Sequence, residues 1–147
     1  MVNVFEQVLP GLAGKDFSVT SAKDSVYNCI AWAAGVNNNW WWPGDPARTH
    51  WPASVPREET IEAFKLMFET LGFQLSSSEE MDPDFEKIAL FANEFGRPKH
   101  AARQLATGRW TSKLGKMEDI EHDLRDLAGA FYGSVVLVMK RNITGLV

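Results

Sequence analysis

Cys29, the only cysteine in the sequence, stands at the start of a run of small and apolar residues that ends at Gly35. This run predicts a short buried helix, because glycine commonly ends a helix just after its last turn. A thiol in the first turn of such a helix faces unpaired N–H groups and the positive end of the helix dipole, and both stabilise the thiolate. Cys29 is therefore a candidate nucleophile if the helix begins near Asn28, although unreactive buried cysteines occupy similar positions. A free thiolate would require its pKa to fall from about 8.5 toward neutrality.

A cysteine hydrolase also needs an imidazole within hydrogen-bond reach of the thiol, and a polar group that orients this imidazole. Of the three histidines, His100 is the best candidate, because it begins a predicted strand directly after a turn at residues 96–98. The small residues Ala101 and Ala102 would let a helix approach this strand closely. We therefore expect His100 to lie near the N-terminus of the helix that carries Cys29.

The orienting group is expected on the next strand of a hairpin whose loop lies near residues 106–108. If this loop has three residues, Ser112 is a diagonal neighbour of His100 on the same face of the hairpin. The two side chains would then be within reach of a hydrogen bond. A two-residue loop would instead bring Thr111 or Lys113 to that face.

Several other polar residues are candidates for the same site. Asn28 and Tyr27 are possible oxyanion donors beside the Cys29 N–H, although Tyr27 equally suits core packing. Gln104 shares a face with the candidate imidazole, because side chains alternate along a strand. His122 points away from the apolar stripe of a predicted helix and hence toward solvent, unless that segment is irregular and supplies a second imidazole. One cysteine and three scattered histidines give little support for a metal site, and we expect no cofactor.

Residues 36–56 form a predicted long loop that contains four of the six tryptophans. Long ordered loops within compact domains are usually functional. Trp41, Trp42 and Trp51, together with Trp40, either cap the core or form the wall of a binding cleft. The sequence leaves both interpretations open.

Composition excludes several classes of protein. The chain has 147 residues, is 45% apolar and carries a net charge of −4 without a basic run, which argues against nucleic-acid binding. A single cysteine excludes an internal disulfide. Residues 1–7 show no secretory leader and no apolar run approaches membrane-spanning length, so we expect a cytoplasmic protein without a membrane segment.

Hydrophobic periodicity predicts the remaining elements. Besides the helix at Cys29 we expect helices over 56–71 and 117–127, and extended segments or strands over 17–20, 73–75, 87–92, 99–105, 109–113 and 134–139. This order favours one α+β domain, residues 1–147. In it an N-terminal helical layer packs on a small, mostly antiparallel sheet, and one helix is inserted before the last strand.

The order of Cys29, HAARQ at residues 100–104 and WTSK at residues 110–113 resembles the papain-like superfamily in its compact bacterial forms, such as NlpC-type endopeptidases and CHAP amidases. In those proteins a cysteine opens a helix, a histidine opens the next strand, and a polar residue on the neighbouring strand orients the imidazole. YNCIAWA at residues 27–33 and WTSKLG at residues 110–115 also resemble a family of small, uncharacterised bacterial proteins. The sequence departs from the papain-like pattern in its third position, where a hydroxyl residue replaces the usual His, Asn or Asp.

The resemblance implies a papain-like fold and a thiol hydrolase or amidase that acts on a peptide or amide bond. Cys29 would attack the carbonyl, His100 would take and return the proton, and Ser112 would orient His100. The alternative is a non-catalytic binding module whose tryptophan-rich loop holds a peptide, a glycan or a protein partner. A regulatory or antitoxin-type role has no specific support in the sequence, which also leaves the substrate and the oligomeric state open.

Overall fold

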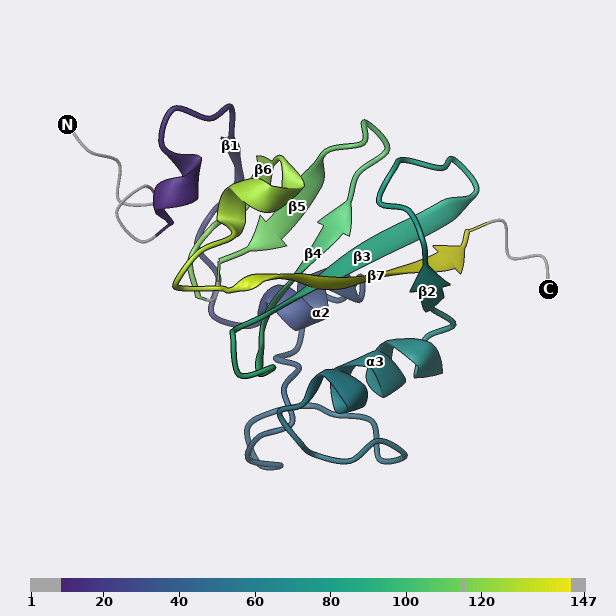
Figure 1. Ribbon diagram of the computed structural model, residues 1–147. Helices are drawn as coiled ribbons and strands as arrows, with labels where there is room; N and C mark the ends of the chain where they lie inside the picture. Colours follow the sequence, from purple (N-terminus) through teal and green to yellow (C-terminus); the bar gives the residue numbers. More distant parts are fainter. Residues whose placement is uncertain (1–8, 115, 144–147) are drawn as a thin grey trace.

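The computed structural model describes residues 9–114 and 116–143. Residues 1–7, on which the expectation about a secretory leader rests, lie outside the described residues. In chain order the elements are η1 (Pro10–Leu12), β1 (Ser18–Ser21), α2 (Cys29–Ala33), α3 (Ile61–Thr70), β2 (Gln74–Ser76), β3 (Phe85–Ala92), β4 (Pro98–Gln104), β5 (Trp110–Lys113), β6 (Asp119–His122), η2 (Leu124–Leu127) and β7 (Ser134–Asn142). Figure 1 shows that the strands lie together as one sheet, with α2 and α3 as the only α-helices among the described residues.

Seven strands form one sheet in the order β1-β6-β5-β4-β3-β7-β2, and each neighbouring pair is antiparallel. β3 lies inside the sheet because its central residues are apolar on both faces: Ile88 and Leu90 belong to one core, and Ala89 and Phe91 to the other. The β4–β5 ladder has only the pairs Arg103–Thr111 and Gln104–Trp110. Toward the start of β4, side chains therefore make the contact between these two strands.

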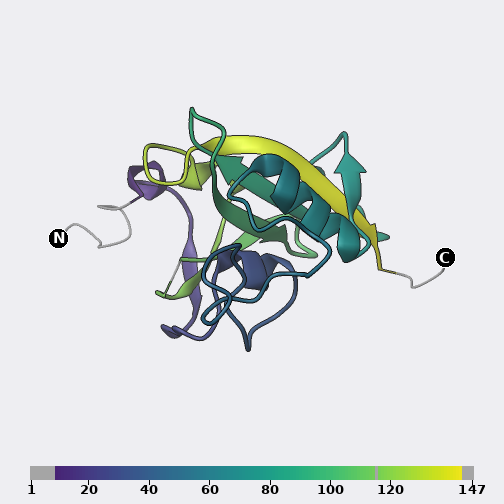
Figure 2. The ribbon, with the colours of Figure 1, turned by 90° about the horizontal axis from the view of Figure 1, so that it is seen from below.

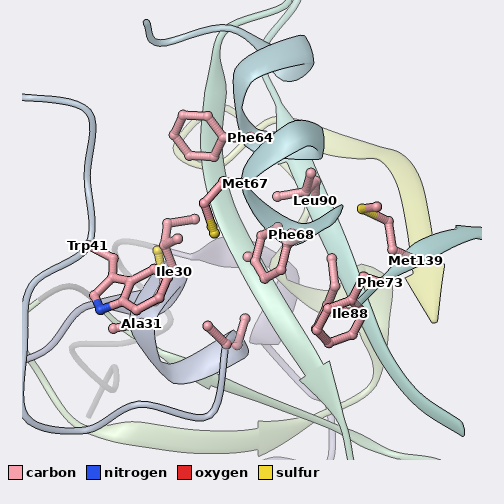
Figure 3. Packing of buried hydrophobic residues seen from close by; sticks show 14 of the residues in the cluster. Ile30, Ala31, Trp41, Phe64, Met67, Phe68, Phe73, Ile88, Leu90 and Met139 are labelled. Carbon is pink, nitrogen blue, oxygen red and sulfur yellow. The ribbon is translucent and has the colours of Figure 1, made fainter. Parts of the chain in front are cut away.

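One face of the sheet is covered by α2, α3 and the tryptophan-rich loop that joins them (Figure 2). The helix α3 begins after Thr60, whose side chain accepts the Ala63 N–H, and it turns its apolar stripe toward the sheet. Figure 3 shows Phe64, Met67 and Phe68 of this helix packed against side chains from the sheet and α2. This core holds α2 against β4 and β5.

The opposite face is covered by the two short 3-10 helices, η1 and η2, and by the segment that carries Tyr132. Its buried residues include Ala102, Trp110 and Ile120 from three consecutive strands. No helix in the described parts of the chain is long and apolar enough to cross a membrane.

The expected fold class is wrong. A seven-stranded antiparallel sheet dominates the described residues, and α2 and α3, of five and ten residues, do not form a helical layer on a small sheet. The strands expected near residues 87–92, 99–105, 109–113 and 134–139 are confirmed as β3, β4, β5 and β7, and 17–20 and 73–75 overlap β1 and β2. The helix expected over 56–71 is confirmed in its central and C-terminal parts.

The inserted helix expected over 117–127 is also wrong, because this segment forms β6 and then η2. Ile120 and His122 are fully buried and Glu121 between them is not, which is the two-residue alternation of a strand. The apparent helical stripe of Ile120, Leu124 and Leu127 arises because a strand residue is followed by two residues of one 3-10 turn. Pairing with β1 and β5 stabilises the extended form.

We predict that Phe68→Ala lowers the free energy of unfolding by about 3–5 kcal/mol, because Phe68 is fully buried and packs edge-on against Phe73. Urea denaturation monitored by tryptophan fluorescence measures this change. The exposed neighbour Glu69→Ala is the matched control and should change stability by less than about 0.5 kcal/mol. Equal effects of the two substitutions would contradict the packing of α3 on the sheet.

Candidate active site

Cys29 is the first residue of α2 and lies against β4. Asn28 caps the helix: its Oδ1 accepts the Ala31 N–H at 3.2 Å. The backbone N–H of Ala101, the residue that follows His100, lies close enough to the Cys29 sulfur to favour its thiolate. The helix therefore begins where the sequence suggested, and the thiol reaches the part of β4 that carries the candidate imidazole.

Burial raises the pKa of the Cys29 thiol to about 11, because desolvation penalises the thiolate. The N–H groups of Ala101, Ile30 and Cys29 itself, and the charge of Lys113, oppose this shift without reversing it. The expected fall of the pKa toward neutrality is therefore not found. The helix has only five residues and its first turn is buried, so desolvation outweighs its dipole. At neutral pH, Cys29 is a neutral thiol.

Three buried side chains form a continuous hydrogen-bonded chain across β4, β5 and β6. His100 Nε2 lies 2.8 Å from Ser112 Oγ, and the same oxygen lies 2.7 Å from His122 Nε2. His122 Nδ1 lies 2.7 Å from the carbonyl oxygen of Asp123. The predicted hydrogen bond between His100 and Ser112 is present, in the register of the three-residue loop.

These contacts determine where the protons lie. The Asp123 carbonyl can only accept, so His122 carries its proton on Nδ1 and its Nε2 accepts. Ser112 therefore donates its hydroxyl proton to His122 and accepts a hydrogen bond from His100 Nε2–H. In a neutral imidazole with a proton on Nε2, the other nitrogen has a free lone pair. His100 Nδ1 is consequently the basic atom of its ring.

His100 Nδ1 is buried and has no hydrogen-bond partner among the described residues. The ring is fixed between two aromatic side chains: Tyr132 stacks on it with centroids 4.1 Å apart, and Phe91 contacts it edge-on at 5.3 Å. Burial, together with the nearby His122, holds the pKa of His100 well below its usual range. His100 is therefore a neutral imidazole with one unused acceptor, and its Nδ1 is not hydrogen bonded to Cys29.

A cavity of about 640 Å³ opens at Cys29, within the size range of small-molecule sites. It is lined by Asn28, Cys29, Trp40, Trp42, Lys99, Leu114, Lys116, Phe131 and Tyr132. Tyr132 thus links the cavity to the His100 ring, and burial together with the nearby Cys29 raises the pKa of its phenol. Among the described residues, no group of three or more His, Cys, Asp or Glu side chains could hold a metal ion.

Asn28 and Tyr27 have roles other than the proposed oxyanion contact. The Asn28 amide clamps the tryptophan-rich loop, because Nδ2 donates to the Trp41 carbonyl at 2.7 Å and Oδ1 accepts the Trp41 N–H at 3.0 Å. The Tyr27 hydroxyl donates to Asp119 at 2.9 Å. The Tyr27 hydroxyl is therefore engaged in a structural hydrogen bond, whereas the Asn28 amide uses one of its two N–H groups in the clamp and also lines the cavity.

Three further candidates on the hairpin also make structural contacts. Gln104 donates to the carbonyls of Glu79 and Gly108, at the end of β4 away from His100. Thr111 accepts the Trp32 indole N–H, and Lys113 donates to the carbonyls of Asp24 and Met117. Thr111 and Lys113 lie on the α2 face of β5, and Ser112 therefore faces the other way.

The tryptophans of the loop divide between the two expected roles. Trp41 and Trp51 belong to the core, with 8% and 4% of their surface exposed. Trp40 and Trp42 line the cavity, although Trp42 also packs edge-on against Phe64. His50 is exposed and its ring lies against Trp41. The loop therefore both closes the core and forms part of the cavity wall.

Sequence reasoning did not identify Tyr132. It is presented by a tight loop in which Gly129 and Gly133 exchange two backbone hydrogen bonds, of 2.9 and 2.7 Å. A Cβ on Gly133 would lie 2.0 Å from the Ala92 carbonyl oxygen, and its φ of +78° also favours glycine. The sequence signal that could have indicated Tyr132 was the pair Gly129 and Gly133 around the dipeptide Phe131-Tyr132, because two such glycines allow a tight turn that fixes one side chain.

The described geometry is that of a buried hydrogen-bonded chain, His100–Ser112–His122, with the Cys29 helix packed against the strand that carries His100. Residues 18–140 match the family described as "Domain of unknown function (DUF7689)", and the chain belongs to this family. The matched region contains Cys29, His100, Ser112 and His122. Comparison with curated proteins and with solved structures finds no match.

We predict that stability falls as pH falls from about 6.5 to about 4. The His122 pKa is lowered to about 4, chiefly by burial, so in this window the unfolded chain binds more protons than the folded one. This residue alone should remove about 2.5 kcal/mol from the free energy of unfolding between about pH 7.5 and about pH 4.5. The lowered pKa of His100 acts in the same direction.

Urea denaturation at the two pH values measures this effect. In His122→Asn the difference in the free energy of unfolding between the two pH values should shrink by about 2 kcal/mol. The matched control His50→Asn removes an exposed imidazole outside the hydrogen-bonded chain and should leave the difference unchanged. A pH dependence unaffected by His122→Asn would contradict the burial of a neutral imidazole at this position.

Proposed function

We propose that this protein is a thiol hydrolase or amidase that cleaves a peptide or amide bond through Cys29 and His100. The observation that carries the proposal is the single free acceptor of His100, Nδ1, on a ring whose other nitrogen is held by Ser112. The Cys29 sulfur contacts the backbone of the next residue, Ala101, and lies on a cavity. The thiol lines the cavity, and the His100 ring, on the other face of β4, stacks on Tyr132, which also lines the cavity. A thiol and a free imidazole acceptor are the parts that acyl transfer requires.

In the first half-reaction, the Cys29 sulfur attacks the carbonyl carbon while its proton moves to His100 Nδ1. The imidazolium then gives this proton to the leaving nitrogen, the C–N bond breaks, and a thioester remains on Cys29. In the second half-reaction, water attacks the thioester and loses a proton to His100, which returns it to the sulfur. The carboxylic acid leaves and both side chains regain their starting protonation.

Both groups rest in their neutral forms, because the thiol pKa is raised and the imidazole pKa is lowered. The mechanism is therefore general-base catalysis during attack, rather than attack by a preformed thiolate. Ser112 and His122 support the transient imidazolium, since their hydrogen bonds lead from His100 Nε2–H to the Asp123 carbonyl. The Cys29 N–H and the second N–H of the Asn28 amide are the candidate oxyanion donors, because the other Asn28 N–H is held by the Trp41 carbonyl.

The papain-like relationship belongs to this proposal. Three features support it: a cysteine at a helix start, a histidine early in a later strand, β4, and a polar residue on the hairpin partner β5. So does the hydrogen bond from the imidazole to that partner, although here a hydroxyl and a second imidazole occupy the orienting positions. A peptide or amide substrate and a cytoplasmic location are parts of the same proposal.

A non-catalytic binding module is the second candidate function. Trp40 and Trp42 on the cavity wall favour it, because indole rings bind peptides and sugars by stacking and apolar burial. This function depends on the cavity and not on the thiol. Cys29→Ala should then preserve ligand binding and biological activity, whereas the hydrolase proposal requires the thiol for turnover.

The pH dependence of Cys29 alkylation by iodoacetamide tests the proposed role of His100. With His100 as general base, the wild-type rate should be nearly constant between about pH 6.5 and about pH 8.5, because the lowered pKa keeps the imidazole neutral throughout. In His100→Gln only the small thiolate fraction reacts. Its rate should rise about tenfold per pH unit toward the thiol pKa of about 11.

Alkylation is counted by intact mass, since Cys29 is the only thiol. The control His50→Asn should keep the flat wild-type profile. Identical, steeply rising profiles in wild type and His100→Gln would overturn the proposed Cys–His pair. Circular dichroism of His100→Gln establishes that a change in slope is not a consequence of unfolding.

A further inference from the structure

The cavity at Cys29 is lined by positive charge although the chain as a whole is acidic, with a net charge of −4. Lys99 and Lys116 are its two charged lining residues, and both are exposed. Neither forms an ion pair with a carboxylate of the described residues. No Asp or Glu of the described chain lines the cavity. Within the described residues, the cavity is therefore lined by two lysines and by no carboxylate.

The rest of the lining is mainly apolar. Trp40, Trp42, Leu114 and Phe131 contribute flat or aliphatic surface, and Phe131 is 56% exposed beside the Tyr132 ring. An exposed aromatic side chain at the mouth of a cavity is typical of a surface that is covered when a ligand binds. A complementary ligand thus has an apolar part for these walls and a negative charge for the lysines.

We propose that the site selects acidic peptides, in which a carboxylate lies next to the amide that reaches Cys29. The ammonium groups of Lys99 and Lys116 bind the carboxylate, and the aromatic walls hold the neighbouring backbone and side chain. The cleavage step in this proposal rests on the hydrolase function proposed above, but selection of an anion beside the thiol does not. The two can therefore fail separately.

A pair of small alkylating reagents measures this selection directly. Iodoacetate and iodoacetamide have nearly the same size and both transfer a carbon to sulfur with loss of iodide, but only iodoacetate carries a carboxylate. We expect the iodoacetate-to-iodoacetamide rate ratio at Cys29 to exceed that of a neutral cysteine peptide by about threefold or more, as attraction to two exposed charges allows. Raising the salt concentration should bring the ratio back toward that of the peptide.

The double variant Lys99→Gln, Lys116→Gln should lower the ratio to that of the peptide. Lys15→Gln, an exposed lysine that does not line the cavity, is the matched control and should keep the wild-type ratio. A wild-type ratio no higher than that of the peptide, or one unaffected by salt and by the double variant, would overturn the proposal. The ratio compares two reagents on one thiol, so the result holds whether or not the protein hydrolyses amides.

Discussion

The site depends on one buried chain of hydrogen bonds, from His100 through Ser112 and His122 to the Asp123 carbonyl. Its direction is fixed at the far end, where a carbonyl can only accept a proton. Each link then determines the next, so a backbone atom of the residue after β6 sets the tautomer of an imidazole on β4. All three side chains are fully buried, and a break in the chain would leave buried polar atoms without partners.

The fold brings together the side chains that form these hydrogen bonds. β4, β5 and β6 are consecutive antiparallel strands, and alternation places His100, Ser112 and His122 on the same face. The backbone ladder between β4 and β5 ends at Arg103–Thr111, and beyond it the imidazole and the hydroxyl join the strands. On the other face α2 brings Cys29 to the Ala101 N–H, while Asn28 ties the start of this helix to the tryptophan-rich loop.

The sequence predicted the parts of the site that local rules control. The His100–Ser112 contact was expected for one of two loop lengths, and the structure has that one, with a turn at Gly108 whose φ is +91°. The sequence predicted the helix that carries Cys29 but left its start open, and the Asn28 cap places that start at Cys29. His122 was harder to place, since its segment fits a helical stripe as well as a strand and only pairing with β1 and β5 decides between them. Tyr132 and the raised pKa of Cys29 depend on tertiary burial, which periodicity does not report.

The fixed tautomer of His100 is the central claim, and NMR of protein labelled with 15N-histidine measures it most directly. Long-range 1H–15N correlation spectra at about pH 7 distinguish the two ring nitrogens of each neutral imidazole. The structure predicts a proton on Nε2 of His100 and on Nδ1 of His122, with both rings neutral. A His100 ring protonated on Nδ1 would have no free acceptor nitrogen to take a proton and would contradict the account.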